Sequence, residues 1–284
     1  MIIVSIFSQH EDFIELQYNS ILKHVKNNYE YVILNNAQNN TQYQRNEDMC
    51  KRLDIRCIKI NSNNFKSPSN IAGEALNQML EIFKGETIFK IDSDMFFISD
   101  IDLNIMLNNN DILYIPVFSG EPLKEWLWSG VFGLNTSIIN NPINCLPSNG
   151  FDTFGESRFL LENPNIKIKK INLFGLQQFE GETMVTSYNN DCVTKFNSSG
   201  ETVSIEREDY LSLYNLKNIN YYEKYQNIKR YVDKYEFPNP YMVDIITIDD
   251  VDTIIHYKSA SWDRLTETYN YEKKRALTNL LNDI

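Results

Sequence analysis

Two aspartates, Asp92 and Asp94, stand one residue apart in the run Lys90-Ile-Asp-Ser-Asp-Met-Phe-Phe97. They directly follow an apolar segment with the character of a strand, and apolar residues follow them. In an α/β sheet, ligands bind at the carboxyl ends of the strands, where two unpaired carboxylates would repel each other. A divalent cation relieves that repulsion, and hard oxygen ligands suit Mg²⁺ or Mn²⁺. The motif therefore favours a metal site, with Asp92 and Asp94 as ligands.

The same spacing of aspartates occurs twice more, at Asp100-Ile-Asp102 and Asp250-Val-Asp252. The spacing alone is a weak signal. We interpret the second motif as a solvated turn and the third as a loop at a strand edge. Position directly after an apolar strand distinguishes the first motif from the other two.

A second candidate group is His256, in the run Ile254-Ile-His-Tyr-Lys-Ser-Ala-Ser-Trp262. The chain has three histidines, and this one ends a strand pattern that enters a polar loop. A lone histidine in such a place is often structural. Its neighbours Lys258 and Trp262 favour a ligand instead, because an imidazole can complete a Mn²⁺ shell and a lysine can reach phosphate oxygens.

The segments that must position these groups alternate between strand and helix patterns. Short apolar runs predict strands over 2–7, 31–34, 55–60 and 87–91, and helical spacing of apolar residues predicts helices over 13–25 and 67–83. Ser67 and Pro68 offer a helix start, and Gly85 offers a stop. Alternation at this spacing predicts an α/β/α sandwich with a mostly parallel central sheet.

The pattern is less regular after residue 100. Apolar runs predict strands at 112–117, 131–134, 245–248 and 253–255, with a Trp- and Pro-rich loop between the first two, and a terminal helix over 269–281. Residues 176–240 suggest hairpin strands and a tyrosine-dense helical stretch. No repeat or linker divides the chain, so we expect one domain over 1–284 with an irregular C-terminal half.

Composition excludes several classes of protein. The 284 residues carry 27 Lys and Arg against 38 Asp and Glu, a net charge of −11 without a basic run, which argues against a nucleic-acid partner. A hydrophobic fraction of 42% supports a sizeable core. No apolar run reaches the roughly 20 residues that a transmembrane helix needs, and the N-terminal residues lack the features of a signal peptide. We therefore expect a cytoplasmic protein with its four irregularly spaced cysteines reduced.

Three segments together resemble the nucleotide-sugar-dependent glycosyltransferases of the GT-A fold, which carry an Asp-x-Asp motif. They are the opening strand IIVSIF, residues 72–97 with the acidic motif, and the closing run HYKSASW. The resemblance implies a metal-dependent transfer of a sugar from a nucleoside diphosphate sugar, UDP-sugar above all, to a glycan, glycoprotein or other hydroxyl acceptor. It also implies a nucleotide-binding half over 1–100 and an acceptor-binding half over 101–284.

Individual site residues follow from the same resemblance. Asp92, Asp94 and His256 would hold the metal, Asp92 and Ser93 would lie beside the donor, and Lys258 or Trp262 would contact its diphosphate. The nucleoside pocket would be lined by polar residues at the exits of the first two strands: Ser5, Ser8 and Asn35. Trp128, in the run Trp-Ser-Gly-Val-Phe-Gly, would lie under the donor sugar, although ordinary packing explains it equally well. Asn77 matches the family's helix asparagine only loosely.

A transferase that inverts the anomeric carbon also needs a carboxylate to deprotonate the acceptor hydroxyl. Asp152 and Glu156, in the loop Phe151-Asp-Thr-Phe-Gly-Glu-Ser-Arg158, are the two candidates. A helix N-cap is an equal alternative for Asp152. We prefer Asp152 as the base, because its shorter side chain loses less entropy when it is held in place.

Two other functions remain open from the sequence. A sugar nucleotidyltransferase also uses paired acids in an α/β sandwich, but it usually begins with a glycine-rich loop and a basic residue, which Ile6-Phe-Ser-Gln-His10 lacks. A catalytically silent carbohydrate-binding protein of the same fold is the second alternative.

Overall fold

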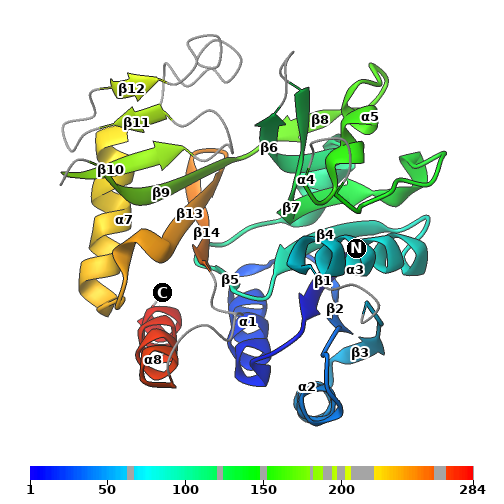
Figure 1. Ribbon diagram of the computed structural model, residues 1–284, viewed down its shortest axis with the longest axis horizontal. Coiled ribbons are helices and arrows are strands. Elements are labelled where there is room, and N and C mark those ends of the chain that lie inside the picture. The colour runs from blue at the N-terminus through cyan, green and yellow to red at the C-terminus, as the bar shows by residue number, and fades with distance from the viewer. Residues whose placement is uncertain are drawn as a thin grey trace.

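The computed structural model of the protein describes residues 1–62, 67–119, 124–147, 152–179, 182–187, 194–196, 202–205, 221–258 and 267–283. Two seven-stranded sheets carry the fold, and helices pack around them (Figure 1). The helices are α1 (Glu11–His24), α2 (Asn40–Arg52), α3 (Pro68–Ile82), α4 (Leu103–Asn109), α5 (Arg158–Leu161), α7 (Tyr221–Tyr235) and α8 (Glu267–Asp283), with 3₁₀ turns η1 (Thr136–Ile138), η2 (Gly155–Ser157) and η4 (Pro240–Met242). Across the described helices, length and apolar character together fall short of what a membrane span requires.

The first sheet has the strand order β3-β2-β1-β4-β7-β6-β8. Its strands are β1 (Ile2–Phe7), β2 (Glu30–Asn35), β3 (Arg56–Lys59), β4 (Thr87–Asp92), β6 (Ile112–Ser119), β7 (Lys124–Asn135) and β8 (Ile168–Lys170). The pairs β1–β2, β1–β4, β2–β3 and β6–β8 are parallel, whereas β7 runs antiparallel to β4 and β6. The predicted mostly parallel central sheet is therefore confirmed.

Both faces of this sheet are covered. Along β1, Ile3 and Phe7 belong to one core cluster, while Ile2 and Val4 belong to another on the opposite face. Helix α1 contributes buried side chains to the first cluster, and α3 contributes to the second. A strand that is buried on both faces reads as a continuous apolar run, as IIVSIF does. This arrangement confirms the predicted α/β/α sandwich.

The second sheet is antiparallel throughout its described pairs, in the order β12-β11-β10-β9-β13-β14-β5. Its strands are β5 (Met95–Phe97), β9 (Asn172–Phe179), β10 (Glu182–Ser187), β11 (Thr194–Phe196), β12 (Thr202–Ile205), β13 (Val243–Ile248) and β14 (Val251–Tyr257). Helix α7 lies against β9, β10 and β13, and α8 contacts both α1 and α7. The apolar pattern predicts the individual late strands and the hairpins, but it does not predict that they join β5 in one sheet.

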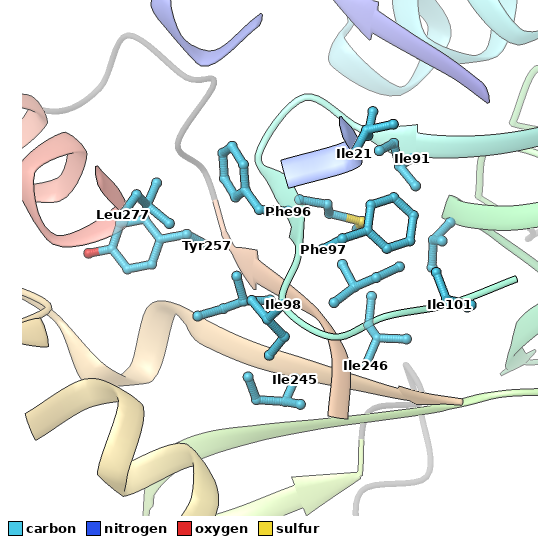
Figure 2. Close-up of a cluster of buried hydrophobic side chains, with 14 of the residues drawn as sticks. Ile21, Ile91, Phe96, Phe97, Ile98, Ile101, Ile245, Ile246, Tyr257 and Leu277 are labelled. Atoms are coloured by element: carbon cyan, nitrogen blue, oxygen red, sulfur yellow. The ribbon is translucent and has the colours of Figure 1, made fainter. Parts of the chain in front are cut away.

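The two sheets share one hydrophobic core. Phe96 and Phe97 of β5 are fully buried and lie among side chains from both sheets. Figure 2 shows Ile91 of β4 and Ile21 of α1 on one side of them and the second sheet on the other. The single domain over 1–284 and its division into a donor half and an acceptor half near residue 100 stay predictions.

Two local features differ from the expectation. Helix α2 was not predicted, because its sequence is almost wholly polar and only Asn46 and Cys50 are buried along it. It begins after Asn39, whose side chain accepts a hydrogen bond from the backbone N–H of Gln42 at 2.8 Å. The Trp-rich segment expected as a loop before residue 131 is already strand, since β7 begins at Lys124.

Helix α3 begins as predicted, with Ser67 as N-cap and Pro68 in the first turn. Gly73 lies inside this helix, where glycine is usually unfavourable. An added Cβ there would lie 2.6 Å from the backbone oxygen of Cys145 and 2.9 Å from the Cα atom of Leu146. Glycine is needed at this position because the backbone of the 145–146 segment approaches the helix closely.

We therefore expect Gly73→Ala to destabilise the protein, although alanine is the better helix former by about 1 kcal/mol. Backbone atoms cannot move aside as a flexible side chain can, and overpacking costs typically about 1–3 kcal/mol. Urea unfolding measures the free energy difference, with the exposed Glu81→Ala of the same helix as control. A stabilised Gly73→Ala variant would contradict the close approach.

Candidate active site

The acidic motif lies at the point where the chain passes from the first sheet to the second. Strand β4 ends at Asp92 and β5 begins at Met95, so only Ser93 and Asp94 lie between the two sheets. Gln17 of α1 donates hydrogen bonds of 2.7 Å to the backbone oxygens of both Asp92 and Met95. The Gln17 amide oxygen in turn accepts a hydrogen bond of 2.6 Å from the Tyr31 hydroxyl. These contacts fix the backbone of the acidic turn from the side of α1.

Asp92 is paired with a buried lysine. Lys90, two residues earlier on β4, is 3% exposed, and its ammonium donates to the Asp92 carboxylate and to the backbone oxygens of Ser129 and Gly130. The pKa of Asp92 is raised above its ordinary value. Desolvation raises it most, the neighbouring Lys90 lowers it, and the charge of Asp94 raises it. Because 40% of the Asp92 side chain remains in contact with solvent, water limits the effect of this desolvation.

Asp94 is almost fully buried and faces His256. The Asp94 Oδ1 atom lies 3.5 Å from His256 Nε2, and the other ring nitrogen, Nδ1, lies 3.2 Å from Oδ2 of Asp244. Lys258 Nζ lies 2.9 Å from the second oxygen of Asp244. The four side chains thus form a row of alternating acids and bases, from the acidic turn to the interior of the second sheet.

The ionisation of His256 follows from this row. Burial alone would lower its pKa, but hydrogen bonds to Asp244 and Asp94 outweigh burial and raise the pKa to about 9. The imidazole is therefore protonated at neutral pH in the metal-free protein, and its charge lies between two buried carboxylates. Trp128 of β7 packs beside the ring, with the two ring centroids 5.6 Å apart and the planes at 59°.

A cavity of about 500 Å³ opens beside the acidic turn, between the first sheet and α3. Asp92 and Ser93 line it together with Lys90. Its other walls are polar residues that follow β1 and β2 and apolar residues of α3, among them Ser8, Gln9, Asn36, Gln38, Ile71 and Leu76. Among the described residues, cavities of about 540, 600 and 420 Å³ lie elsewhere on the surface, and the acidic turn lines none of these three. The carboxyl ends of parallel strands are where this class of sheet binds its ligands.

The predicted nucleoside-pocket residues divide into two groups. Ser8 lines the cavity. Ser5 is fully buried and donates to the backbone oxygen of Ile91 at 2.9 Å, so it connects β1 to β4. Asn35 is also fully buried and donates to the backbone oxygen of Tyr43 at 2.9 Å. In this structure Ser5 and Asn35 support the cavity from within and do not reach its surface.

The two candidate bases, Asp152 and Glu156, have different surroundings. Glu156 accepts a hydrogen bond of 2.8 Å from the backbone N–H of Asn144 and lines a different cavity from the one beside Asp92. Asp152 is exposed and accepts a hydrogen bond of 2.7 Å from the backbone N–H of Thr153. The loop of Asp152 adjoins the start of α3, because the Thr153 hydroxyl donates to the backbone oxygen of Ser69 at 3.0 Å.

Three further predicted residues have other placements. Lys258 Nζ lies 2.9 Å from Asp244 Oδ1, and Lys258 does not line the cavity beside the acidic turn. Asn77 accepts a hydrogen bond of 2.9 Å from the backbone N–H of Cys145, which is a packing role. Trp262 lies outside the described residues.

The residues present fit a divalent cation in part. Within the described ranges, no group of three or more His, Cys, Asp and Glu side chains is arranged as a complete metal site. Asp94 Oδ1 and His256 Nε2 are 3.5 Å apart, close to the spacing of about 3 Å between neighbouring ligands of an octahedral ion. They offer one carboxylate oxygen, a donor that suits Mn²⁺ or Mg²⁺, and one imidazole nitrogen, a donor typical of first-row transition metals. Lys90 is paired with one oxygen of Asp92, Oδ1, and the three-residue set stays a prediction.

Sequence reasoning missed four residues of this site. They are the amide that holds the acidic turn, the lysine beneath it, the carboxylate that pairs with His256, and the glycine that packs against this carboxylate: Gln17, Lys90, Asp244 and Gly175. Asp244 could have been found from the sequence, since an aspartate within the apolar run VDIITI is a buried charge that requires a partner.

The comparisons with known proteins give distant likenesses. No family model matches the chain. RecBCD enzyme subunit RecD of Buchnera aphidicola subsp. Schizaphis graminum (strain Sg) is 25% identical over an alignment of 235 residues that covers 77% of this chain and 36% of that protein. The chain therefore spans about a third of the length of that relative, and this identity does not place it in the same family.

Among solved structures, an active-site mutant of the galactosyltransferase LgtC gives a TM-score of 0.41 at 12% identity over 61% of this chain and 73% of its own. The mannosyltransferase PcManGT of Pyrobaculum calidifontis, solved with GDP-Man and Mn²⁺, gives 0.42 at 9% identity over 60% and 53%. The bifunctional glycosyltransferase WbbM gives 0.30 at 17% identity over 57% and 32%. Likenesses at these scores assign neither an activity nor a residue to this chain.

The raised pKa of His256 predicts a pH-dependent stability. The folded-state pKa of about 9 exceeds the ordinary value of 6.5, so the stabilisation is complete below pH 6.5 and is lost as the pH rises through about 9. We expect wild-type protein without added metal to melt several degrees above His256→Gln at pH 6 and this margin to shrink by pH 9.5. Thermal unfolding across this range measures it, and a margin that grows with pH would contradict the charged row.

The hydrogen bonds of Gln17 to the acidic turn predict that loss of Gln17 destabilises the protein more than loss of the Tyr31 hydroxyl does. Gln17→Leu leaves the backbone oxygens of Asp92 and Met95 and the Tyr31 hydroxyl without their partner, and each unsatisfied group costs about 1–3 kcal/mol. We expect the free energy of unfolding to fall by at least about 3 kcal/mol, since three groups lose their partner. Tyr31→Phe, which removes only one of these contacts, should cost about 1 kcal/mol. Equal effects of the two variants in urea unfolding would show that Gln17 does not hold the turn.

Proposed function

We propose that the protein is a glycosyltransferase that moves a sugar from a nucleoside diphosphate sugar to a hydroxyl acceptor in the cavity beside the acidic turn. One observation carries the proposal: Asp92 and Ser93 line a cavity of about 500 Å³ at the carboxyl ends of parallel strands, while Asp94 meets His256 directly behind them. This volume lies within the usual range for small-molecule sites. The proposal depends on this arrangement and on the resemblance of the motifs, not on the distant structural likenesses.

The walls of the cavity suit the parts of such a donor. Polar side chains at the strand exits, among them Ser8, Asn36 and Gln38, can hydrogen-bond a base and a ribose. Ile71 and Leu76 of α3 offer an apolar surface opposite the sheet. We propose a UDP-sugar as the donor, with its diphosphate toward the acidic turn.

The reaction requires stabilisation of the nucleoside diphosphate that leaves. A Mn²⁺ or Mg²⁺ ion bound by Asp94 and His256, with Asp92, would supply a Lewis acid at that point. Lys90 places a buried positive charge beside the same end of the cavity and can attract the diphosphate. Trp128 packs against His256, at the place where the resemblance expects the donor sugar to lie.

For the acceptor we propose a glycan, a glycoprotein or a small molecule with a free hydroxyl. Neither Asp152 nor Glu156 lines the donor cavity. We propose Asp152 as the base of an inverting reaction, because Glu156 lines a separate cavity and accepts a hydrogen bond there. The loop of Asp152 adjoins the start of α3, whose Pro68 lines the donor cavity. A cytoplasmic location also stays a proposal.

The first test is metal-dependent turnover. We expect Mn²⁺ to stimulate hydrolysis or transfer of at least one nucleoside diphosphate sugar from a panel that includes UDP-sugars, measured as released nucleoside diphosphate. Asp94→Asn should reduce the rate at least 100-fold, because it removes the charge that faces His256. Asp250→Asn is the matched control from another Asp-x-Asp motif, since it lies in a turn with φ 63°, which asparagine tolerates. Absence of turnover with every donor would support a silent binding protein. Formation of a nucleoside triphosphate and a sugar 1-phosphate, when pyrophosphate is added together with the donor, would support a nucleotidyltransferase.

The second test concerns the base. A base acts in the transition state, so Asp152→Asn should lower kcat at least 100-fold and leave the KM for the donor nearly unchanged. The anomeric configuration of the product, measured by NMR, determines whether the reaction inverts. A product that retains the configuration of the donor would remove the need for a base, and the assignment of Asp152 would then be wrong.

A further inference from the structure

Four residues form a row across the second sheet that ends beside the acidic turn. Gly175 of β9 pairs with Asp244 of β13, Asp244 pairs with His256 of β14, and His256 pairs with Met95 of β5. Asp94 immediately precedes Met95, and its backbone oxygen accepts a hydrogen bond of 3.0 Å from the backbone N–H of Tyr257. The ladder of the sheet therefore sets the position of His256 relative to Asp94.

Asp244 sits within this row with both oxygens close to cations, through a contact with the His256 ring at Oδ2 and an ion pair without hydrogen-bond geometry at Oδ1. It is 2% exposed, and Oδ2 lies 3.2 Å from His256 Nδ1 while Oδ1 lies 2.9 Å from Lys258 Nζ. Burial of a carboxylate is costly unless it is paired. Lys258 lies two residues after His256, so these two residues of one short segment hold the carboxylate from two directions.

Gly175 provides the space for this carboxylate. A Cβ atom at Gly175 would lie 2.1 Å from Oδ1 and 3.2 Å from Cγ of Asp244, and 3.7 Å from Lys258 Nζ. No side chain fits at such a distance, so any residue other than glycine would displace the carboxylate. The position of the Asp244 carboxylate therefore requires glycine at residue 175 of β9.

We propose that Asp244 is a positioning residue that holds the His256 ring with Nε2 directed at Asp94, and that Gly175 and Lys258 exist in this row to keep Asp244 in place. The inference rests on the proposed function, in which Nε2 binds the cation. Histidine ligands commonly donate their second ring nitrogen to a carboxylate, which fixes the orientation of the ring, and loss of that partner weakens metal binding about 10–100-fold. Trp128, packed beside the ring, limits its rotation further.

A purely structural role for Asp244 makes a different prediction. If the Asp244–Lys258 pair served stability alone, its loss would lower the melting temperature and leave the geometry at Nε2 unchanged. The same hairpin contains a matched control for that role. Asp252 of β14 is also mostly buried and also pairs with a lysine, Lys224, at 2.8 Å, but its partners belong to α7 and β13 and not to the acidic turn.

The experiment compares Asp244→Asn, Gly175→Ala and the control Asp252→Asn in the full-length chain. Isothermal titration with MnCl₂ alone measures the Kd for the metal without substrate. We expect Asp244→Asn and Gly175→Ala each to raise this Kd at least 10-fold and Asp252→Asn to change it less than 2-fold. An unchanged Kd in folded Asp244→Asn or Gly175→Ala protein would overturn the proposal.

A second measurement tests the orientation of the His256 ring in the absence of metal. Long-range ¹H–¹⁵N NMR spectra of the metal-free protein resolve the ring nitrogens, which is feasible because the chain has three histidines. We expect a hydrogen-bonded Nδ1 proton on His256 in wild-type and Asp252→Asn protein, and its loss or a large shift in the other two variants. If wild-type protein binds no Mn²⁺ but shows this pattern, the metal of the proposed function is wrong and the positioning of the ring stands. If the Nδ1 signal is the same in all four proteins, the positioning itself is wrong.

Discussion

The two residues between β4 and β5 are the constraint on which the rest of the site depends. The chain leaves the mostly parallel first sheet at Asp92 and enters the antiparallel second sheet at Met95. Because only two residues connect the strands, the two sheets must meet at Ser93 and Asp94. The apolar residues on either side anchor this crossing, because Ile91 and Phe96 are both fully buried in the shared core. The acidic turn is therefore held by hydrophobic burial, and its carboxylates take the orientation that the two sheets impose.

This crossing explains why residues from distant parts of the chain share one site. The first sheet contributes the cavity and Lys90, whereas the second contributes His256, Asp244 and Lys258 through the hairpin β13–β14. The first sheet ends at Asp92 and the second positions His256, so the acidic turn gains its imidazole where the two sheets meet. The separation in sequence between Asp94 and His256 is bridged by a single strand pair, β14 with β5.

The sequence predicted the parts of this structure that depend on local pattern. The opening strand, helix α3 with its Ser67 cap, and the approximate position of β4 all follow from apolar periodicity and capping, and Asp94 beside His256 agrees with the resemblance of the motifs. Helix α2 escaped prediction because its buried face is too small to show a period. The second sheet, Gln17 and Asp244 escaped because antiparallel pairing between distant strands, and the partners of buried polar groups, depend on contacts that no local pattern encodes. Ser5 and Asn35 were placed at the right strands but on the buried side of the cavity wall.

The charges of the site suggest how a metal-free and a metal-bound state can both be stable. The site holds three carboxylates, on Asp92, Asp94 and Asp244. It also holds three positive charges, on Lys90, Lys258 and the protonated His256. The formal charges of these six side chains therefore cancel without a metal, which is the condition under which buried ions are tolerated. On the proposed function, a divalent ion would take the place of the proton on His256, since only the neutral imidazole is a ligand. On that proposal, Asp244 would keep its contact of 3.2 Å with Nδ1 while Nε2 exchanged a proton for the metal ion.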